Sequence, residues 1–275
     1  MITSLIAVFV APNWIGGLGG WRAYILEPLL AFILLAATIT EREHVQALRR
    51  SLLLIVVPLV LWALIQFVTG NGIPHPWDVS IAAGRRATGP YPFPNALALF
   101  VAPIGAYAFA LWVRAPRQWS FLGVFLAAVI GILLARSDGG LIALACAVAL
   151  ALCGVRWGRR AVVAGSVLGA AILLASSSVR AAVWRELTFQ GWSGRVRVWM
   201  WQETWQMLKD HWFFGAGFGG YPTVFDPYHK KRFIEIFQYP HTLVFNVWSE
   251  VGLLGLAAFA ALVGRWVKTA VQVVR

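Results

Sequence analysis

Long apolar runs separated by short polar segments make up most of the sequence. Several of these runs approach the roughly 20 residues that a helix needs to cross a bilayer. They fall at residues 24–39, 51–69, 95–113, 119–135, 140–155, 161–176 and 242–264, with a partial run at 2–13. Because a segment within lipid must satisfy its own backbone hydrogen bonds, such runs favour helices. The pattern predicts an all-α, polytopic membrane protein of about seven to eight spans, with residues 1–275 forming a single membrane domain.

The composition agrees with this class and argues against others. Of the 275 residues, 60% are hydrophobic and 12% are charged, and the mean hydropathy is +0.72, far above the range of soluble domains. The net charge of +12 does not indicate nucleic-acid binding, because the basic residues are scattered through short loops and form no continuous stripe. The expected partner is the lipid bilayer, and no nucleic acid is expected.

The basic residues also predict the orientation of the chain. Four segments that alternate along it hold 11 Lys and Arg residues against two acids, and the positive-inside rule assigns them to the cytoplasm. They are residues 41–50, 114–117, 156–160 and the tail after Gly264. The outer side then receives residues 70–94, the turn at 136–139 and the longest polar segment, 177–240. Since long loops are often functional, any chemistry is expected on this outer side.

An amphipathic helix is predicted within the 177–240 loop, at about residues 195–212. Its apolar stripe recurs at alternating spacings of three and four residues, and polar side chains fall off the stripe. The stripe consists of Val198, Trp201, Trp205, Leu208 and Trp212. Because tryptophan at this density favours the membrane interface, the helix is expected to lie on the outer surface of the bilayer. The alternative is a helix that packs on its own cap of loop residues.

The last predicted span, residues 241–264, opens with one polar residue and contains another. His241 follows Pro240 and would lie at the outer interface, where an imidazole can accept a proton near neutral pH; a purely structural, helix-capping histidine is the alternative. Glu250 would lie roughly 13 Å deeper along a regular helix. A carboxylate at such a depth costs about 2.5–3.5 kcal/mol unless it has a partner. A neutral or arginine-paired structural role is therefore favoured for Glu250 over direct catalysis.

Arginines on the outer side form the second candidate group. Arg195 and Arg197 enter the predicted amphipathic helix near its N-terminus, where guanidinium groups and free N–H groups suit a phosphate or diphosphate. Anchoring to phospholipid headgroups would use the same chemistry. The residues Arg85, Arg86 and Arg136 extend this outward-facing basic rim, and all of them are candidate ligands of an anionic substrate. In the RSDGG turn, Arg136 is also expected to form an ion pair with Asp138.

No motif indicates a metal ion or a cofactor. The sequence has no CxxC set, no HExxH and no Asp-x-Asp, and its acids are dispersed. The glycines at 215, 217 and 220 match GxGxxG, but no strand precedes them, so a dinucleotide site is not expected. The two cysteines, Cys146 and Cys153, are interpreted as packing residues.

Two blocks of sequence resemble a known family. The stretch HTLVFNVWSEVGLLG resembles the C-terminal signature of the O-antigen ligase and polymerase superfamily, with the signature positions filled by His241, Glu250, Gly252 and Gly255. Upstream, SGRVRVWMWQETWQMLKDHWFFGAGFGGY is similar to the family segment that precedes this histidine. Thr242 stands where the family usually has Asn. Weaker similarity in TGPYPFPNALA and RSDGG extends the resemblance to roughly residues 85–264, and because this family is usually longer, it implies a shortened or partial member.

The resemblance implies a metal-independent enzyme without a cofactor, in the inner membrane of a bacterium, with its active side periplasmic. Such an enzyme takes a glycan from a polyprenyl diphosphate, typically undecaprenyl diphosphate, and passes it to a hydroxyl of a lipid or polysaccharide acceptor such as lipid A-core, a step of lipopolysaccharide biosynthesis. In that scheme His241 is the base or orients the acceptor hydroxyl. Arg195 is the first choice, and Arg136 the second, for stabilising charge on the leaving diphosphate.

Other functions stay open at this point. The sequence does not separate a ligase from a polysaccharide polymerase or a protein O-glycosyltransferase. A transporter or flippase is an alternative of another class, although transport sites usually show ionisable residues or broken helices near the bilayer midplane, where only Glu250 is expected. A non-catalytic membrane scaffold is the remaining alternative, and it does not require Arg195 and His241 to converge.

Overall fold

The computed structural model describes residues 2–274, which are helical or irregular and contain no strand. Four helices are long and apolar enough to cross a membrane: Trp14–Thr38, Arg42–Thr69, Pro94–Arg114 and Leu243–Gln272. The all-helical membrane class is therefore confirmed. The count of seven to eight spans is not, because the predicted spans at 119–135 and 140–155 form shorter helices, Trp119–Leu134 and Asp138–Cys153.

The chain divides into two compact units. One consists of residues 1–37 and 176–275, and the other of residues 38–175. The single membrane domain expected for residues 1–275 stays a prediction.

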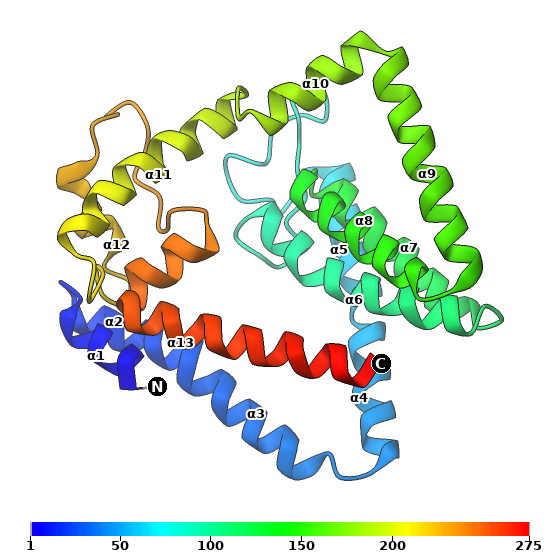
Figure 1. The fold of residues 1–275 in the computed structure, drawn as a ribbon, viewed down its shortest axis with the longest axis horizontal. Coiled ribbons are helices and arrows are strands. Elements are labelled where there is room, and N and C mark those ends of the chain that lie inside the picture. Colours follow the sequence, from blue (N-terminus) through cyan, green and yellow to red (C-terminus); the bar gives the residue numbers. More distant parts are fainter. Residues whose placement is uncertain (1, 275) are drawn as a thin grey trace. The chain divides into compact units, whose positions relative to one another are not determined.

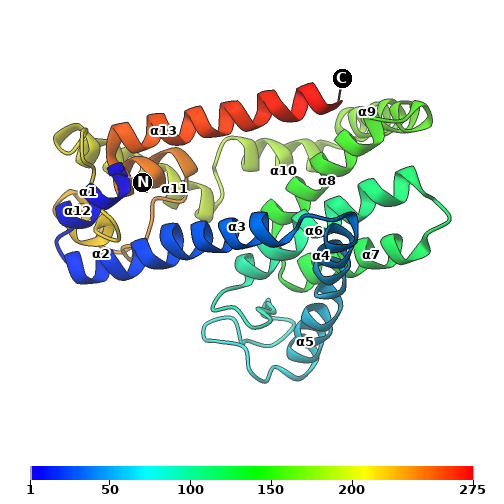
Figure 2. The ribbon, with the colours of Figure 1, turned by 90° about the horizontal axis from the view of Figure 1, so that it is seen from below.

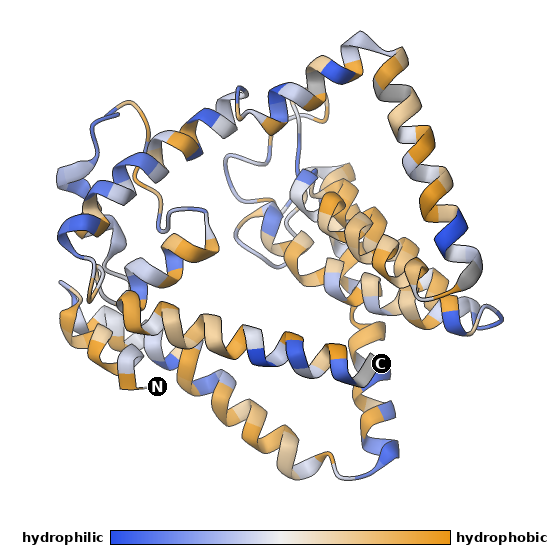
Figure 3. Cartoon of the chain, in the orientation of Figure 1, coloured by the Kyte–Doolittle hydropathy of each residue, from blue (hydrophilic) through white to orange (hydrophobic). Residues whose placement is uncertain are grey.

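The 38–175 unit is a bundle of apolar helices, coloured mostly as hydrophobic in Figure 3. Its helices are α4 (Arg42–Leu54), α5 (Val56–Thr69), α6 (Pro94–Arg114), α7 (Trp119–Leu134), α8 (Asp138–Cys153) and α9 (Arg156–Ala175). Small residues allow α7 to approach its neighbours closely: a Cβ at Gly105 of α6 would overlap the methyl group of Ala128 on α7, and a Cβ at Gly131 of α7 would overlap Val60 on α5. The close packing of these helices therefore depends on glycine at both positions.

A buried glutamine holds the long connection between α5 and α6. Gln66 is 2% exposed, and its amide Nε2 donates to the carbonyl oxygens of Gly72 at 2.8 Å and Gly89 at 2.9 Å. Its Oε1 accepts from the backbone N–H groups of Thr88 at 3.2 Å and Gly89 at 2.8 Å. Because all four of these bonds are made, the amide is tolerated in an apolar helix and the connection that carries Arg85 is fixed against α5.

The other unit combines the two ends of the chain. Its N-terminal part consists of α1 (Ile2–Val10) and a continuous rod, visible in Figure 2, made of α2 (Trp14–Trp21), the π-helical turn η1 (Arg22–Leu26) and α3 (Glu27–Thr38). Its C-terminal part consists of α10 (Ser177–Leu187), α11 (Trp192–Asp210), α12 (Tyr221–Phe225), the 3₁₀ turn η2 (Asp226–Tyr228) and α13 (Leu243–Val274). Helix α1 packs against α2 and α13.

Helix α11 confirms the amphipathic helix expected at about 195–212, but the predicted apolar face is wrong. The buried face consists of Val196, Met200, Glu203, Thr204, Met207 and Leu208, of which only Leu208 belongs to the predicted stripe. It packs on Tyr221 and Phe225, so the helix lies on a cap of its own loop residues. Trp205 instead packs against the start of α13, with ring centroids 6.4 Å from Phe245 and 5.9 Å from Trp248.

Helix α13 is broken at Gly252, where the backbone has φ 70° and ψ −178°, and Figure 1 shows two segments that meet at a sharp bend. In a regular helix Leu253 N–H would bond to the carbonyl of Ser249. Here Leu253 N–H donates to the Phe213 carbonyl at 3.0 Å, and the Ser249 carbonyl accepts from Ala216 N–H at 2.7 Å. The loop after α11 therefore replaces the broken hydrogen bond on both sides and interlocks with the helix.

Candidate functional site

His241 lies two residues before the start of α13 at Leu243, in the order that the sequence predicts. Thr242 caps the helix, since its Oγ1 accepts a hydrogen bond from Phe245 N–H at 3.1 Å. His241 itself has φ +51°, a left-handed conformation that is uncommon for a residue with a side chain. Its ring meets Phe237 and Tyr239 edge-on, with centroids 4.9 and 4.8 Å away. Two aromatic rings therefore hold the imidazole where the loop turns into the helix.

Arg197 is the arginine whose charge acts on His241. Partial burial lowers the pKa of His241 below its usual value, and the positive charge of Arg197 lowers this pKa further. Both effects favour the neutral imidazole, which is the form able to accept a proton. One turn further along α11, Trp201 donates its indole N–H to the carbonyl of Pro240 at 2.8 Å, which holds the neighbour of His241 against the same helix.

Arg195 lies on a different side of α11. Residues two positions apart on a helix are separated by roughly 200° of rotation, so Arg195 and Arg197 point in nearly opposite directions. The guanidinium carbon of Arg195 lies 5.9 Å from the ring centroid of Trp192. The charge of Arg197 thus acts on His241, whereas the guanidinium of Arg195 lies over the ring of Trp192. Among the described residues, no ion pair occupies either arginine.

Glu250 has a backbone partner and no arginine partner among the described residues. Its Oε2 accepts from Gly219 N–H at 2.8 Å, across the interlock between the glycine-rich loop and the bend of α13. The structural role favoured for this residue agrees with this bond, and of the two forms considered for that role, arginine pairing is not seen among the described residues. Glu250 and His241 lie on the same short segment of α13 and its cap, with Glu250 at the end next to Gly252.

The remaining predicted arginines lie in the 38–175 unit. Arg85 donates from Nη1 to the carbonyls of Phe67 at 2.9 Å and Val68 at 3.2 Å, and from Nε to that of Val79 at 2.8 Å. The two bonds from Nη1 satisfy carbonyl groups in the last turn of α5, where a cation also interacts favourably with the helix dipole. Much of the donor capacity of Arg85 is therefore used inside the protein.

Arg86 is also held on several sides. It lies 4.9 Å from the Trp77 ring centroid, donates from Nε to the Ala135 carbonyl at 2.8 Å, and donates from Nη2 to Asn95 Oδ1 at 2.9 Å. Burial lowers the pKa of Arg86; the carboxylate of Asp138 raises it and the guanidinium of Arg136 lowers it. These opposing effects place Arg86, Arg136 and Asp138 in one neighbourhood.

The RSDGG turn is closed differently from the prediction. Arg136 adopts φ +46° and donates from Nη2 to the Ile81 carbonyl at 3.3 Å. Ser137 caps α8 by accepting from Gly140 N–H at 3.3 Å. No ion pair between Arg136 and Asp138 is present in the part of the chain that the structure describes, so the cap and the backbone conformation close the turn. Arg136 keeps more unused donors than Arg85 or Arg86.

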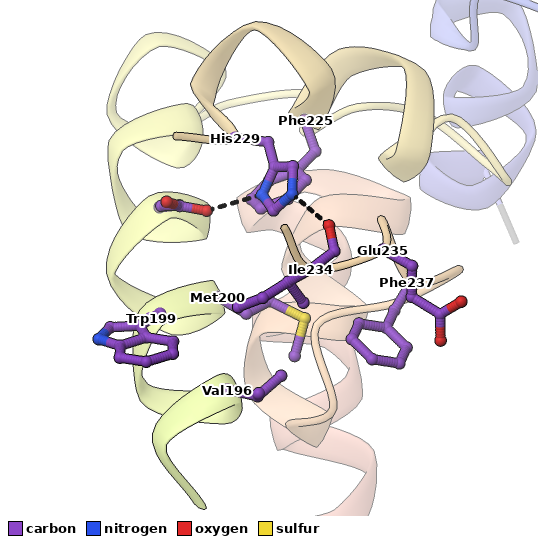
Figure 4. Close-up of a pocket in the computed structure, with 9 residues that line it drawn as sticks. Val196, Trp199, Met200, Phe225, His229, Ile234, Glu235 and Phe237 are labelled. Carbon is purple, nitrogen blue, oxygen red and sulfur yellow. Dashed lines mark hydrogen bonds and ion pairs between the residues drawn. The ribbon is translucent and has the colours of Figure 1, made fainter. Parts of the chain in front are cut away.

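A buried pair that the sequence analysis missed joins α11 to the loop before His241. His229 Nδ1 lies 3.0 Å from Glu203 Oε2, and His229 Nε2 lies 2.8 Å from the Ile234 carbonyl, as drawn in Figure 4. Glu203 Oε1 also accepts from Lys230 N–H at 3.1 Å. The side chains of His229 and Glu203 are 5% and 11% exposed, and the adjoining cavity of about 10 Å³ is no larger than a single water site.

The proton count shows that this pair is structural. Ile234 offers only a carbonyl, so Nε2 must carry a proton, and a second proton must lie between Nδ1 and Glu203. Neither ring nitrogen is left to accept a proton from a substrate. Glu203 lies three residues after Met200 and four before Met207, so this helical spacing could have predicted that Glu203 belongs to the buried face. No local sequence pattern indicates that Glu203 pairs with His229.

Of the described residues, no group of three or more His, Cys, Asp or Glu side chains is arranged to hold a metal ion.

In a comparison with known families, a family model described as O-antigen ligase matches residues 123–260, half of the chain. The match includes Arg136, Arg195, Arg197 and His241, and it excludes Arg85 and Arg86. No curated protein and no solved structure matches the chain.

Proposed function

Because the chain belongs to the O-antigen ligase family, we propose that it transfers a glycan from a polyprenyl diphosphate carrier, such as undecaprenyl diphosphate, to an acceptor hydroxyl. The proposed setting is the periplasmic face of a bacterial inner membrane, where the carrier diphosphate lies at headgroup height. The proposed acceptor is a lipid or polysaccharide, lipid A-core for a ligase. The family match and the apolar helices support a role in glycan transfer at a membrane. The carrier, the acceptor and the side of the membrane are parts of the proposal.

One observation carries the proposal: at the start of a membrane-length helix, His241 is partly buried and subject to the positive charge of Arg197, and both effects lower its pKa. In the proposed step the acceptor oxygen attacks the anomeric carbon and forms the new glycosidic bond, while His241 accepts the hydroxyl proton. The bond between that carbon and the diphosphate oxygen breaks, and its electron pair leaves with the diphosphate. General-base help of this kind is typically worth about 10²–10⁴-fold.

Guanidinium groups supply the positive charge for the leaving diphosphate. Arg197 is assigned to this role because its charge acts on His241, and Arg195, two residues earlier on α11, stays a proposed ligand of the diphosphate. Because these cations stabilise the developing charge, the proposed chemistry needs no metal ion. This assignment changes the order expected from the family resemblance, which put Arg195 first.

Transport is the second candidate function, and the bend of α13 is the observation in its favour. Broken helices with a carboxylate nearby are typical of transporter ion sites, where the freed backbone groups coordinate the ion. Here the freed groups of Ser249 and Leu253 are bonded to Ala216 and Phe213, and Glu250 is bonded to Gly219. With these groups engaged, the bend serves to hold the loop, and glycan transfer is the better-supported function.

The test is a transfer assay with the purified chain in liposomes containing polyprenyl-diphosphate-linked glycan. His241→Ala and Arg197→Gln are each expected to lower kcat by at least about 100-fold, in the range for lost general-base or electrostatic catalysis. The matched controls are His75→Ala and Arg114→Gln, both outside the proposed site. Wild-type turnover by a folded His241→Ala variant would contradict the assignment of His241 as the proton acceptor. That result would favour a transporter or a scaffold.

The acceptor class is tested by the same assay. Lipid A-core, a second carrier-linked glycan and a protein with free hydroxyl groups are supplied separately. Product on the first identifies a ligase, on the second a polymerase, and on the third a protein O-glycosyltransferase. We propose the ligase, and product on either of the other acceptors alone would replace it.

A further inference from the structure

Three aromatic side chains form a cluster where the first turns of α11 meet the loop after His229. The ring centroids of Trp192 and Trp199 are 6.2 Å apart, and both rings lie close to Phe233, at 6.4 Å and 6.0 Å. Trp192 is 59% exposed and Phe233 is 68% exposed, so the cluster lies at the surface of this unit. Edge-to-face and tilted contacts of this kind favour a fixed arrangement of the rings.

Each tryptophan of this aromatic cluster carries a cation on its ring. The guanidinium carbon of Arg195 lies 5.9 Å from the Trp192 centroid, and Nζ of Lys231 lies 5.5 Å from the Trp199 centroid. Both distances are within the range of cation–π attraction. Arg195 comes from α11 and Lys231 from the loop, so residues far apart in sequence place two positive charges on neighbouring rings.

The acids near this cluster do not neutralise the two cations. Asp226 is bonded to Arg232, both through its side chain and through its carbonyl, and Glu203 is bonded to His229 and Lys230. Glu235 lies on the far side of the small cavity from Trp199, and Figure 4 shows its carboxylate directed away from that ring. Within the described residues, neither Arg195 nor Lys231 has an ion-pair partner.

We propose that Arg195 and Lys231, held by the aromatic cluster, form a binding site for the phosphate groups of a lipid-linked diphosphate. The inference rests on the proposed function and adds Lys231 to its substrate contacts. A guanidinium fork and a compact ammonium group offer donors to two adjacent phosphoryl groups. Because the cations occupy the ring faces, the tryptophans serve to hold charge and not to stack on sugars.

Binding of a short-chain polyprenyl diphosphate, farnesyl diphosphate, to the full chain in nanodiscs tests this site. Lys231→Met keeps a long side chain over Trp199 and removes the charge, and it is expected to weaken binding about tenfold, the worth of one charge-assisted contact. Lys230→Met is the matched control, since that lysine contacts Glu203 only through its backbone. Unchanged affinity of Lys231→Met, or equal losses for both lysine variants, would overturn the proposal.

Two further variants separate a built site from general positive charge. If Arg195 and Lys231 grip one diphosphate, the losses in Arg195→Gln and Lys231→Met are expected to be non-additive in the double variant. Phe233→Leu keeps every charge and loosens the cluster, so it is expected to weaken binding severalfold. If the losses of affinity were additive and Phe233→Leu bound like the wild type, general electrostatic attraction would explain the binding. That result would contradict the inference.

The source of the phosphate is distinguished by a second arm with phosphatidylglycerol nanodiscs in place of added diphosphate. A loss confined to farnesyl diphosphate identifies the carrier as the ligand, as expected. If the variants lose affinity only for phosphatidylglycerol, Arg195 and Lys231 bind lipid headgroups, and the assignment to the carrier is overturned. The transfer assay is independent: if His241→Ala abolishes transfer while Lys231→Met binds normally, only this inference fails.

Discussion

The indole N–H of Trp201 donates to the carbonyl of Pro240 at 2.8 Å, and this bond attaches the residue before His241 to the helix that carries Arg197. One hydrogen bond between residues 39 positions apart thus attaches the loop of the proposed proton acceptor to this helix. A catalytic histidine on a loop gains its precision from such supports.

Removing this bond is expected to lower activity without unfolding the protein. Trp201→Phe keeps the ring contact with Phe189 and loses the donor, at a net cost of about 1 kcal/mol. We expect a fall in kcat of about fivefold with little change in KM, measured in the liposome transfer assay. Trp205→Phe, whose ring stacks on Phe245, is the control. Equal kcat values for the two variants would show that the bond does not position His241.

The pH dependence of transfer is expected to report on Arg197. The charge of Arg197 helps to hold the pKa of His241 below its usual value, so the neutral base persists as the pH falls below that value. Arg197→Gln removes the repulsion and raises this pKa, so the imidazole becomes protonated at a higher pH. The acidic limb of kcat against pH should therefore move to higher pH in Arg197→Gln.

Arg195→Gln is the matched control for this profile, because Arg195 lies on the other side of α11. Its acidic limb is expected to coincide with that of the wild type, whatever its rate. If the limb of Arg197→Gln does not move, another group than His241 controls the acidic limb.

The Glu203–His229 pair is expected to contribute strongly to stability. His229→Ala leaves a buried carboxylate with only the Lys230 N–H as a partner, and breaking such a pair typically costs about 3–5 kcal/mol. The expected result is a clear fall in the midpoint of thermal unfolding in detergent. Gln202→Ala, a neighbouring exposed position on α11, is the control.

A double variant tests whether the pairing itself is responsible. Glu203→Met with His229→Leu replaces both polar groups by apolar ones of similar size, which can be nearly neutral. It is therefore expected to be more stable than His229→Ala. A double variant less stable than either single change would mean that the two side chains act separately.

Gly252 is expected to tolerate no side chain. Its φ of 70° disfavours other residues, and a Cβ there would overlap the Phe213 carbonyl oxygen that receives Leu253 N–H. Gly252→Ala should therefore sharply reduce the yield of folded protein, measured by size-exclusion chromatography of the detergent-solubilised chain. Gly264→Ala, in the same helix with open space around it, should leave the yield unchanged. Normal yield from Gly252→Ala would contradict the interlock between the loop and the bend.

Much of this architecture follows from local pattern. Apolar runs of helix length specify helices wherever water is absent, and Thr242 after Pro240 and His241 specifies where the last helix begins. The glycine-rich loop and Gly252 are visible as motifs as well. The sequence by itself therefore determined the helical membrane class, the family resemblance and the place of His241 at a helix start.

The tertiary structure decided which side chains meet. The helical spacing of the tryptophans determined which face of α11 was predicted to be apolar. In the structure Glu203 and Thr204 are buried instead, because His229 and Tyr221, distant in sequence, form hydrogen bonds with them. In the same way the charge of Arg197, and not that of Arg195, acts on His241, since the rotation of α11 depends on the loop packed against it. Periodicity specifies that a helix has two faces; only the partners that satisfy its polar groups determine which face is buried.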